Sequence, residues 1–248
     1  MSFLPLAVVV LFAGLIAVFT LLARRARGRP PSLRPIDAYN SLPQTVGTAV
    51  ETGKRLHISL GTGSVGQPDT AATLAGITIL DQISAYAAVS DRPPVVTTSD
   101  GAAALLAQDA LRGVYARQNA LARYDPNSAQ VAGLSRASFG AAQTTLQSDE
   151  AVAGTVLIGS IGAEAVLLAE AASRAGITTL AGSDNLSGQA MLYAAADHPV
   201  VGEDLYAAGA YAGRAPQHVG SLHAQDVVRL LLAAAIVLGV LGRTLGLF

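Results

Sequence analysis

The sequence predicts an α/β domain with a mostly parallel sheet, flanked by a transmembrane helix at each end of the chain. Apolar segments lie at both termini, and short β-rich runs alternate with Ala-rich helical runs between them. Only 13% of the 248 residues are charged. Strands that alternate with helices of this length form a parallel sheet covered on both faces. We therefore expect a Rossmann-like three-layer architecture.

The N-terminal segment, residues 1–24, has the length and composition of a transmembrane helix. Phe3 to Ala23 is an uncharged run of 21 residues, and roughly 20 apolar residues cross a bilayer. A cleaved signal peptide, the alternative, would carry its positive charge before the apolar run. Here the arginines follow it, so the positive-inside rule places the N-terminus outside the cell and the arginines in the cytoplasm. They are Arg24, Arg25, Arg27, Arg29 and Arg34.

The C-terminal segment, residues 227–248, is expected to span the membrane as well. Its uninterrupted apolar run, Leu230 to Leu241, is shorter than a full span, and the segment reaches about 20 residues only if Arg229 and Arg243 extend to the interface. A shallow or re-entrant helix is the alternative. The expected location is thus the cell membrane, with lipid as a partner, the main domain in the cytoplasm and both termini on the outer side.

Between these segments the sequence divides into a linker, a domain and a lead-in. Residues 25–40 form a basic, Pro-rich linker, because proline cannot continue the preceding helix. Residues 41–214 hold the alternation of strands and helices, and a domain of this size can bury its own core. Residues 215–226 lead into the C-terminal segment.

The elements of the domain follow one pattern, in which a strand ends in Gly, Ser, Thr or Asp and a helix comes next. Strands are predicted at Leu56–Leu60, Val95–Thr98, Gln130–Leu134, Thr155–Ile158 and Ile177–Leu180. Helices are predicted over Ser41–Thr52, Pro68–Val89, Asp100 to about Arg123, Ala137–Leu146, the stretch from Gly162 to Arg174, and Gly188–Ala195. Asp197-His198-Pro199 is expected to break the chain before a last helix, Glu203–Gly213.

The first predicted strand is followed by Gly61-Thr62-Gly63-Ser64-Val65-Gly66, which matches the G-x-G-x-x-G pattern of dinucleotide loops. In such loops the glycines admit a pyrophosphate to the backbone, and the helix N-terminus faces its charge. Two features oppose this interpretation. Asp69 would repel a phosphate. Asp100, the nearest acidic residue at the end of the second predicted strand, lies farther along the chain from the glycines than the ~20 residues expected for a ribose contact. The alternative is a tight turn that requires glycine φ values. The sequence therefore requires no cofactor, and a nucleotide is the one cofactor kept as an alternative.

Polar residues also follow the other predicted strands. The carboxyl ends of parallel strands line one rim of a sheet, and ligands bind there at the point where the strand order reverses. The alternative is that Ser, Asp and Gly are simply the residues that helix starts require. The candidate ligand-binding residues are Gly61, Thr62, Gly63, Ser64, Gly66, Asp100, Ser160 and Asp184.

Most enzyme classes lack their usual sequence signals here. The chain has no Cys, and it contains no P-loop, G-x-S-x-G, H-E-x-x-H or EF-hand motif. His57 is typical of a core histidine, and His198 has no nucleophile marked by a motif. His218 and His223 are five residues apart instead of the four of a helical metal pair. We therefore assign no catalytic or metal-binding residue, and a net charge of -1 offers no basic surface for nucleic acid.

Three helical runs are apolar on nearly every side. A helix of this kind must be buried all round, and we expect a single domain to have too little interior for all three. Identical subunits in a homo-oligomer are the simplest cover. The three runs are Thr70–Leu80, Ala163–Ala172 and Ala207–Ala212.

Four short motifs resemble those of an uncharacterised family of bacterial membrane proteins defined by a domain of unknown function. They are SLGTG at Ser59–Gly63, TLAG at Thr73–Gly76, ADHP at Ala196–Pro199 and AAGAY at Ala207–Tyr211. The resemblance covers residues 36–229 and implies an α/β domain between terminal membrane segments. It implies no activity, so it assigns no functional residue.

The sequence leads to two functional hypotheses. The first is a membrane-anchored homo-oligomer with a structural or scaffolding role. The second is a membrane-tethered sensor or enzyme that binds a nucleotide or a small anionic ligand at the rim formed by Gly61–Gly66.

Overall fold

A computed structural model of the chain describes residues 4–25, 33–87, 92–149, 151–213 and 216–245. The chain divides into two compact units. Arg34–Ala212 form the first, an α/β domain, and Met1–Leu33 with Gly213–Phe248 form the second, which is helical.

The α/β domain is built on a six-stranded sheet in which all pairs of described strands are parallel. The strand order is β3-β2-β1-β4-β5-β6, the order of dinucleotide-binding Rossmann domains. The order reverses between β1 and β4, which therefore end at the topological switch point. The strands are β1 Arg55–Gly61, β2 Val95–Thr98, β3 Ala129–Val131, β4 Val152–Ser160, β5 Thr178–Ser183 and β6 His198–Val200.

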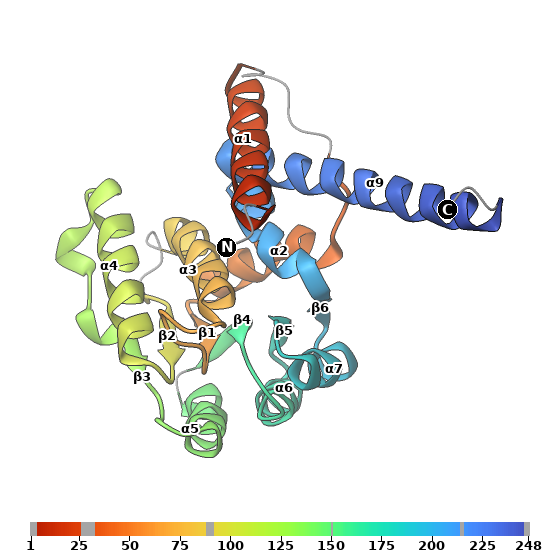
Figure 1. Ribbon diagram of the computed structural model, residues 1–248. Helices are drawn as coiled ribbons and strands as arrows, with labels where there is room; N and C mark the ends of the chain where they lie inside the picture. The colour runs from red at the N-terminus through yellow and green to blue at the C-terminus, as the bar shows by residue number, and fades with distance from the viewer. Residues whose placement is uncertain (1–3, 26–32, 88–91, 150, 214–215, 246–248) are drawn as a thin grey trace. The chain divides into compact units, whose positions relative to one another are not determined.

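Helices cover both faces of this sheet (Figure 1). Ile58 of β1 and Val156 of β4 pack with side chains of α2 (Asp37–Glu51), α3 (Thr70–Ala87) and α8 (Ala208–Ala212) on one face. α4 (Gly101–Arg117) packs beside α3. Leu157 and Ala181, which point the other way, pack with α6 (Ala165–Arg174) and α7 (Leu186–Ala195). α5 (Arg136–Asp149) lies beside α6. The predicted three-layer α/β fold is confirmed.

The edge strand β6 was not predicted. Asp197-His198-Pro199 was expected to break the chain, yet His198 and Val200 pair with Leu180 and Gly182 of β5. A proline lacks the N–H group that a central strand needs, but on an edge that group would face away from the ladder. Pro199 is therefore compatible with a strand here, and the chain then continues as a 3-10 helix, Gly202–Ala207, before α8.

Two of the three apolar helical runs are mostly covered within the domain, whereas the third keeps an exposed apolar side, and their cover by neighbouring subunits stays a prediction. α3 lies against β1, β4, α4 and α8, and Ile79, Leu80 and Ile83 are almost fully buried. Ala208 and Ala210 of α8 are buried too. Small residues make this possible, because Gly76 lets α3 approach the backbone of β4 closely. Apolar side chains stay exposed on α6, at Val166 and Leu167, and on α3, at Leu74.

The helical unit consists of α1 (Leu4–Arg25) and α9 (Pro216–Thr244), which pack against each other. Gly220 lies against the backbone of Thr20, and the rings of Phe19 and His223 stack with centroids 6.0 Å apart. α9 is 29 residues long and apolar enough to cross a membrane. Its first turns cover most of the predicted lead-in, which is helical and continuous with the apolar part. In α1 the described side chains form an apolar stretch, Val9–Leu22.

The approach of α3 to β4 gives a test of this packing. A Cβ atom at position 76 would collide with the Ile158 carbonyl oxygen, so Gly76→Ala should lower the free energy of unfolding by about 1–3 kcal/mol. Gly47→Ala is the matched control, because position 47 is in α2 with no atom near the added methyl group. It should raise the free energy of unfolding by about 0.5–1 kcal/mol. Denaturant unfolding of the full chain, followed by circular dichroism, measures both, and equal stability of the two variants would contradict this packing.

Candidate functional site

The carboxyl ends of β1 and β4 are where this sheet topology favours a ligand. The loop from Thr62 to Asp69 follows β1 and leads to α3, and residues 161–164 connect β4 to α6. Of the predicted site residues, Gly61, Thr62, Gly63 and Ser160 lie together here. Ser64 joins them to Asp100, whereas Asp184 is exposed at the end of β5.

Hydrogen bonds join the ends of β1 and β4 directly. The backbone N–H of Thr62 donates to the Ser160 carbonyl oxygen at 2.7 Å, and the Thr62 hydroxyl donates to the same oxygen at 3.2 Å. Gly61 has a φ of +77°, which favours glycine. A Cβ atom on Gly61 would collide with the same carbonyl group. The first glycine of the pattern is thus required by contact between two strands.

The second glycine faces protein atoms. A Cβ atom on Gly63 would lie 2.5 Å from the Thr73 hydroxyl oxygen, 3.0 Å from Ser160 Cβ and 3.4 Å from an oxygen of Asp69. In a dinucleotide loop this is the position that lets the pyrophosphate approach the backbone. Here the space beside Gly63 is lined by α3 and the end of β4.

The backbone N–H groups before α3 already have a partner. α3 begins at Thr70, and the Thr70 hydroxyl oxygen accepts from the N–H groups of Gly66 at 2.8 Å and Gln67 at 3.0 Å. Gly66, with φ +88°, provides the turn that brings these groups together. The carboxylate of Asp69 stands next to them, where its charge opposes a bound anion.

Asp100 connects the loop after β1 to the start of α4. Its Oδ1 accepts from the backbone N–H of Ala103 at 2.8 Å, and its Oδ2 accepts from the Ser64 hydroxyl at 2.9 Å. The predicted helix cap is confirmed. Because both oxygens have structural partners, this carboxylate stabilises the rim.

Sequence reasoning missed the polar residues that organise the loop after β4. The Ser183 hydroxyl accepts from the backbone N–H of Ile161 at 2.9 Å and donates to its carbonyl oxygen at 2.8 Å. Asn185 caps α7 by accepting from the N–H groups of Ser187 and Gly188. Asn directly before a helical run is a common cap, so its position in the sequence was an available signal.

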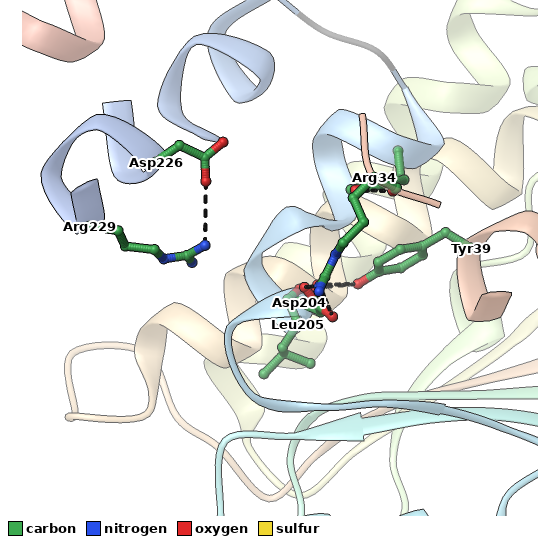
Figure 2. Close-up of polar contacts among 7 residues, drawn as sticks. Arg34, Tyr39, Asp204, Leu205, Asp226 and Arg229 are labelled. Carbon is green, nitrogen blue, oxygen red and sulfur yellow. Dashed lines mark hydrogen bonds and ion pairs between the residues drawn. The ribbon is translucent and has the colours of Figure 1, made fainter. Parts of the chain in front are cut away.

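A second polar cluster ties the two ends of the domain together (Figure 2). Arg34 forms an ion pair with Asp204 at 2.7 Å, and the Tyr39 hydroxyl donates to the Asp204 carbonyl oxygen at 2.8 Å. The Tyr211 hydroxyl donates to the Arg34 carbonyl oxygen at 2.5 Å, and the rings of Tyr39 and Tyr211 stack. Burial and the nearby charge of Asp204 raise the pKa of Tyr39, so its hydroxyl remains a donor. Arg34, Tyr39, Asp204 and Tyr211 are called the end clamp below.

The described pockets lie away from the switch point. One of about 540 Å³ runs beside the edge strand β6 and is lined by Arg34–Ala38, Asp197–Pro199 and Asp204. A smaller one of about 120 Å³ lies between α2 and the amino ends of β4–β6, and most of its lining residues are polar: Ser41, Gln44, Thr45, Thr48, Thr178 and His198. Within the described part of the chain, no three acidic or histidine side chains are grouped to hold a metal ion.

The comparisons with known proteins give a family and no function. A family model described as a domain of unknown function (DUF6754) matches residues 2–248. No match was found among curated proteins or among solved structures. The resemblance expected from the four sequence motifs is confirmed as far as a domain of unknown function, whereas membrane location and bacterial origin stay predictions.

The two acidic rim residues should respond differently to substitution. Asp100→Ala removes the helix cap and the partner of Ser64, so it should lower the free energy of unfolding by about 1–2 kcal/mol. Asp184→Ala removes an exposed carboxylate that caps no helix, so it should change the free energy of unfolding by at most about 0.5 kcal/mol. Denaturant unfolding of both variants is the measurement. A larger loss for Asp184→Ala would show that Asp100 does not have the structural role described.

His57 should make the domain sensitive to acid. Its ring is fully buried in β1, its Nε2 contacts the Thr97 hydroxyl at 2.9 Å, and burial lowers its pKa to about 4. Between pH 6.5 and 4 the unfolded chain binds a proton that the folded chain does not, so stability falls as the pH falls. The loss should be about 3 kcal/mol for this shift. His57→Gln should remove that part of the pH dependence, and an unchanged profile would contradict a buried neutral imidazole.

Proposed function

The chain belongs to the DUF6754 family, a family defined by a domain of unknown function, and we propose that this member is a membrane-anchored, homo-oligomeric scaffold with a cytoplasmic Rossmann-like domain. The observation that carries the proposal is an exposed set of apolar side chains at the carboxyl rim of the sheet, where enzymes of this architecture present polar ligand-binding groups.

The apolar rim is formed by residues that follow five of the six strands. Leu134 after β3 is 85% exposed, and Leu186 at the start of α7 is 80% exposed. Grouped exposed apolar side chains are typical of protein contact surfaces, and we propose that the side chains of this set form such a surface. The apolar rim comprises Val65, Leu105, Val131, Leu134, Leu186 and Val201.

Membrane attachment is supported by the two terminal helices. α9 is long enough to cross a bilayer, and its large apolar side chains from Leu230 to Leu241 are exposed. Val9, Val10 and Leu11 of α1 are exposed as well. Lipid is the natural cover for these side chains. We propose that both helices span, with both termini on the outer side, because the arginines after α1 follow the positive-inside rule.

The end clamp supports a double anchor. It joins Arg34, where the domain begins, to Tyr211, directly before its end. Two chain ends held together can both connect to one membrane surface without opening the domain.

Nucleotide binding at the rim is less well supported. The atoms beside Gly63 belong to the protein itself, the N–H groups of Gly66 and Gln67 bond Thr70, and the loop contains Asp69. A phosphate would have to displace these contacts and overcome repulsion from the carboxylate. The scaffold is therefore the function that the geometry favours.

Extraction in detergent, mass measurement and electron microscopy test the proposal. We expect a large symmetric particle whose thermal stability does not change with added ATP or NAD. A monodisperse monomer that nucleotide stabilises would favour the ligand-binding alternative. Release from membranes by carbonate would refute the anchor, and cleavage of the domain by protease outside intact cells would refute its cytoplasmic placement.

Substitutions at the apolar rim should weaken assembly. Leu134→Gln with Leu186→Gln removes two apolar side chains from a proposed contact, and burial of a leucine is worth about 1.5–3 kcal/mol. The assembly should dissociate at roughly 100-fold higher concentration, or more, by mass photometry. Leu121→Gln is the matched control, because Leu121 is exposed after the C-terminal end of α4, which runs from the carboxyl end of β2 back toward the amino ends of the strands. If Leu121→Gln weakens assembly as much as the double variant does, the apolar rim is not the contact surface.

A further inference from the structure

The space between α5 and the sheet contains an unusual group of buried polar side chains. His57, Ser59, Thr97, Thr155 and Gln143 are fully buried, and Gln147 is almost so. Buried side-chain polar atoms normally have hydrogen-bond partners. Among the described residues seven such atoms have none, and five of them belong to this group: His57 Nδ1, Thr155 Oγ1, Gln143 Oε1, Gln147 Oε1 and Gln147 Nε2.

The backbone places these atoms close together. His57 and Thr155 are register partners on adjacent strands, so their side chains lie next to each other on one face of the sheet. Gln143 donates from Nε2 to the Ser59 hydroxyl at 3.0 Å, which fixes α5 over β1. α5 returns the chain from the carboxyl end of β3 to the amino end of β4, so Gln147 lies one turn further in the direction from Ser59 to His57.

The chemistry of the group selects its occupant. Its side chains are hydroxyls, carboxamides and an imidazole whose pKa burial lowers, so all of them are neutral at physiological pH. They offer both donors and acceptors and carry no charge to hold an ion. A buried water molecule makes about three hydrogen bonds to otherwise unsatisfied polar groups, so five unpaired atoms suit roughly two waters.

We propose that ordered water molecules bind between α5 and strands β1 and β4, bridging His57 and Thr155 to Gln143 and Gln147. The water site adds hydrogen bonds to the apolar contacts by which α5 buries Phe139. It also extends toward the switch point, because the Ser59 hydroxyl that Gln143 contacts accepts from the backbone N–H of Gly61 at 3.4 Å. α5 and the glycine loop are therefore supported by one polar network.

Substitution by apolar residues of similar shape separates a hydrated site from a dry one. Thr155→Val and Gln147→Leu in the full chain remove hydrogen-bonding atoms with little change in volume. If water bridges them, each variant should lower the melting temperature by about 2–4 °C. Each variant should also speed amide hydrogen exchange in α5, residues 136–149, and in the glycine loop, residues 61–66, because both belong to the same polar network. If the site is dry, removal of unpaired polar atoms should raise the melting temperature or leave it unchanged, which would overturn the proposal.

Ser84→Ala is the matched control. The Ser84 hydroxyl is also buried without a partner among the described residues, but it lies in α3 on the opposite face of the sheet, outside this group. Its loss should leave exchange in residues 136–149 unchanged. A high-resolution density map of the unmodified chain provides a second measurement that does not depend on variants. Peaks within hydrogen-bonding distance of Thr155 Oγ1 and His57 Nδ1 would support the water site, and their absence at a resolution that shows other buried waters would overturn it.

Discussion

The contact between the ends of β1 and β4 is the constraint on which the rest of the domain depends. The backbone N–H and the hydroxyl of Thr62 both donate to the Ser160 carbonyl oxygen, at the point where the strand order reverses. In Rossmann domains this point opens into a crevice for a ligand. Here the bonds join the two strand ends, and the glycines that a nucleotide would use are needed for strand contact and for α3. The exposed surface of this rim combines apolar side chains such as Val65 with polar ones such as Asp184.

The sequence was sufficient for most of the fold because local signals agreed with the final packing. β2 has the predicted limits, Val95–Thr98, because β-branched residues end there at Ser99 and a capping aspartate. β6 could not be recognised, since proline argues against a strand unless the strand is known to be at an edge. The strand order itself has no local signal. Which of the three apolar runs would be buried could not be read from the sequence, because residue size, and not only polarity, decides how many helices one core can hold.

The candidate site shows why a motif alone does not define a function. G-x-G-x-x-G describes glycine positions, and both a dinucleotide loop and a closed turn require them. What separates the two is the identity of the atoms beside Gly63, and these come from Thr73 in the next helix and Ser160 in a distant strand. Likewise, His57 was correctly interpreted as a core residue, but its neighbours Thr155 and Gln147 lie about one hundred residues away and could not be assigned to it.

The two helical layers of the domain are stabilised by different interactions. The layer of α2, α3 and α8 shares the largest apolar cluster with the sheet, and the end clamp lies beside it. The opposite layer has smaller apolar clusters. In this layer α5 buries Phe139 and also faces β1 with a polar side chain, Gln143. Regions with few buried apolar contacts open at lower free-energy cost than the rest of a domain. α5 places Gln143 and Gln147, besides Phe139, in its buried contact with the sheet. Less of that contact is apolar than in α3, so α5 should open at a lower free-energy cost.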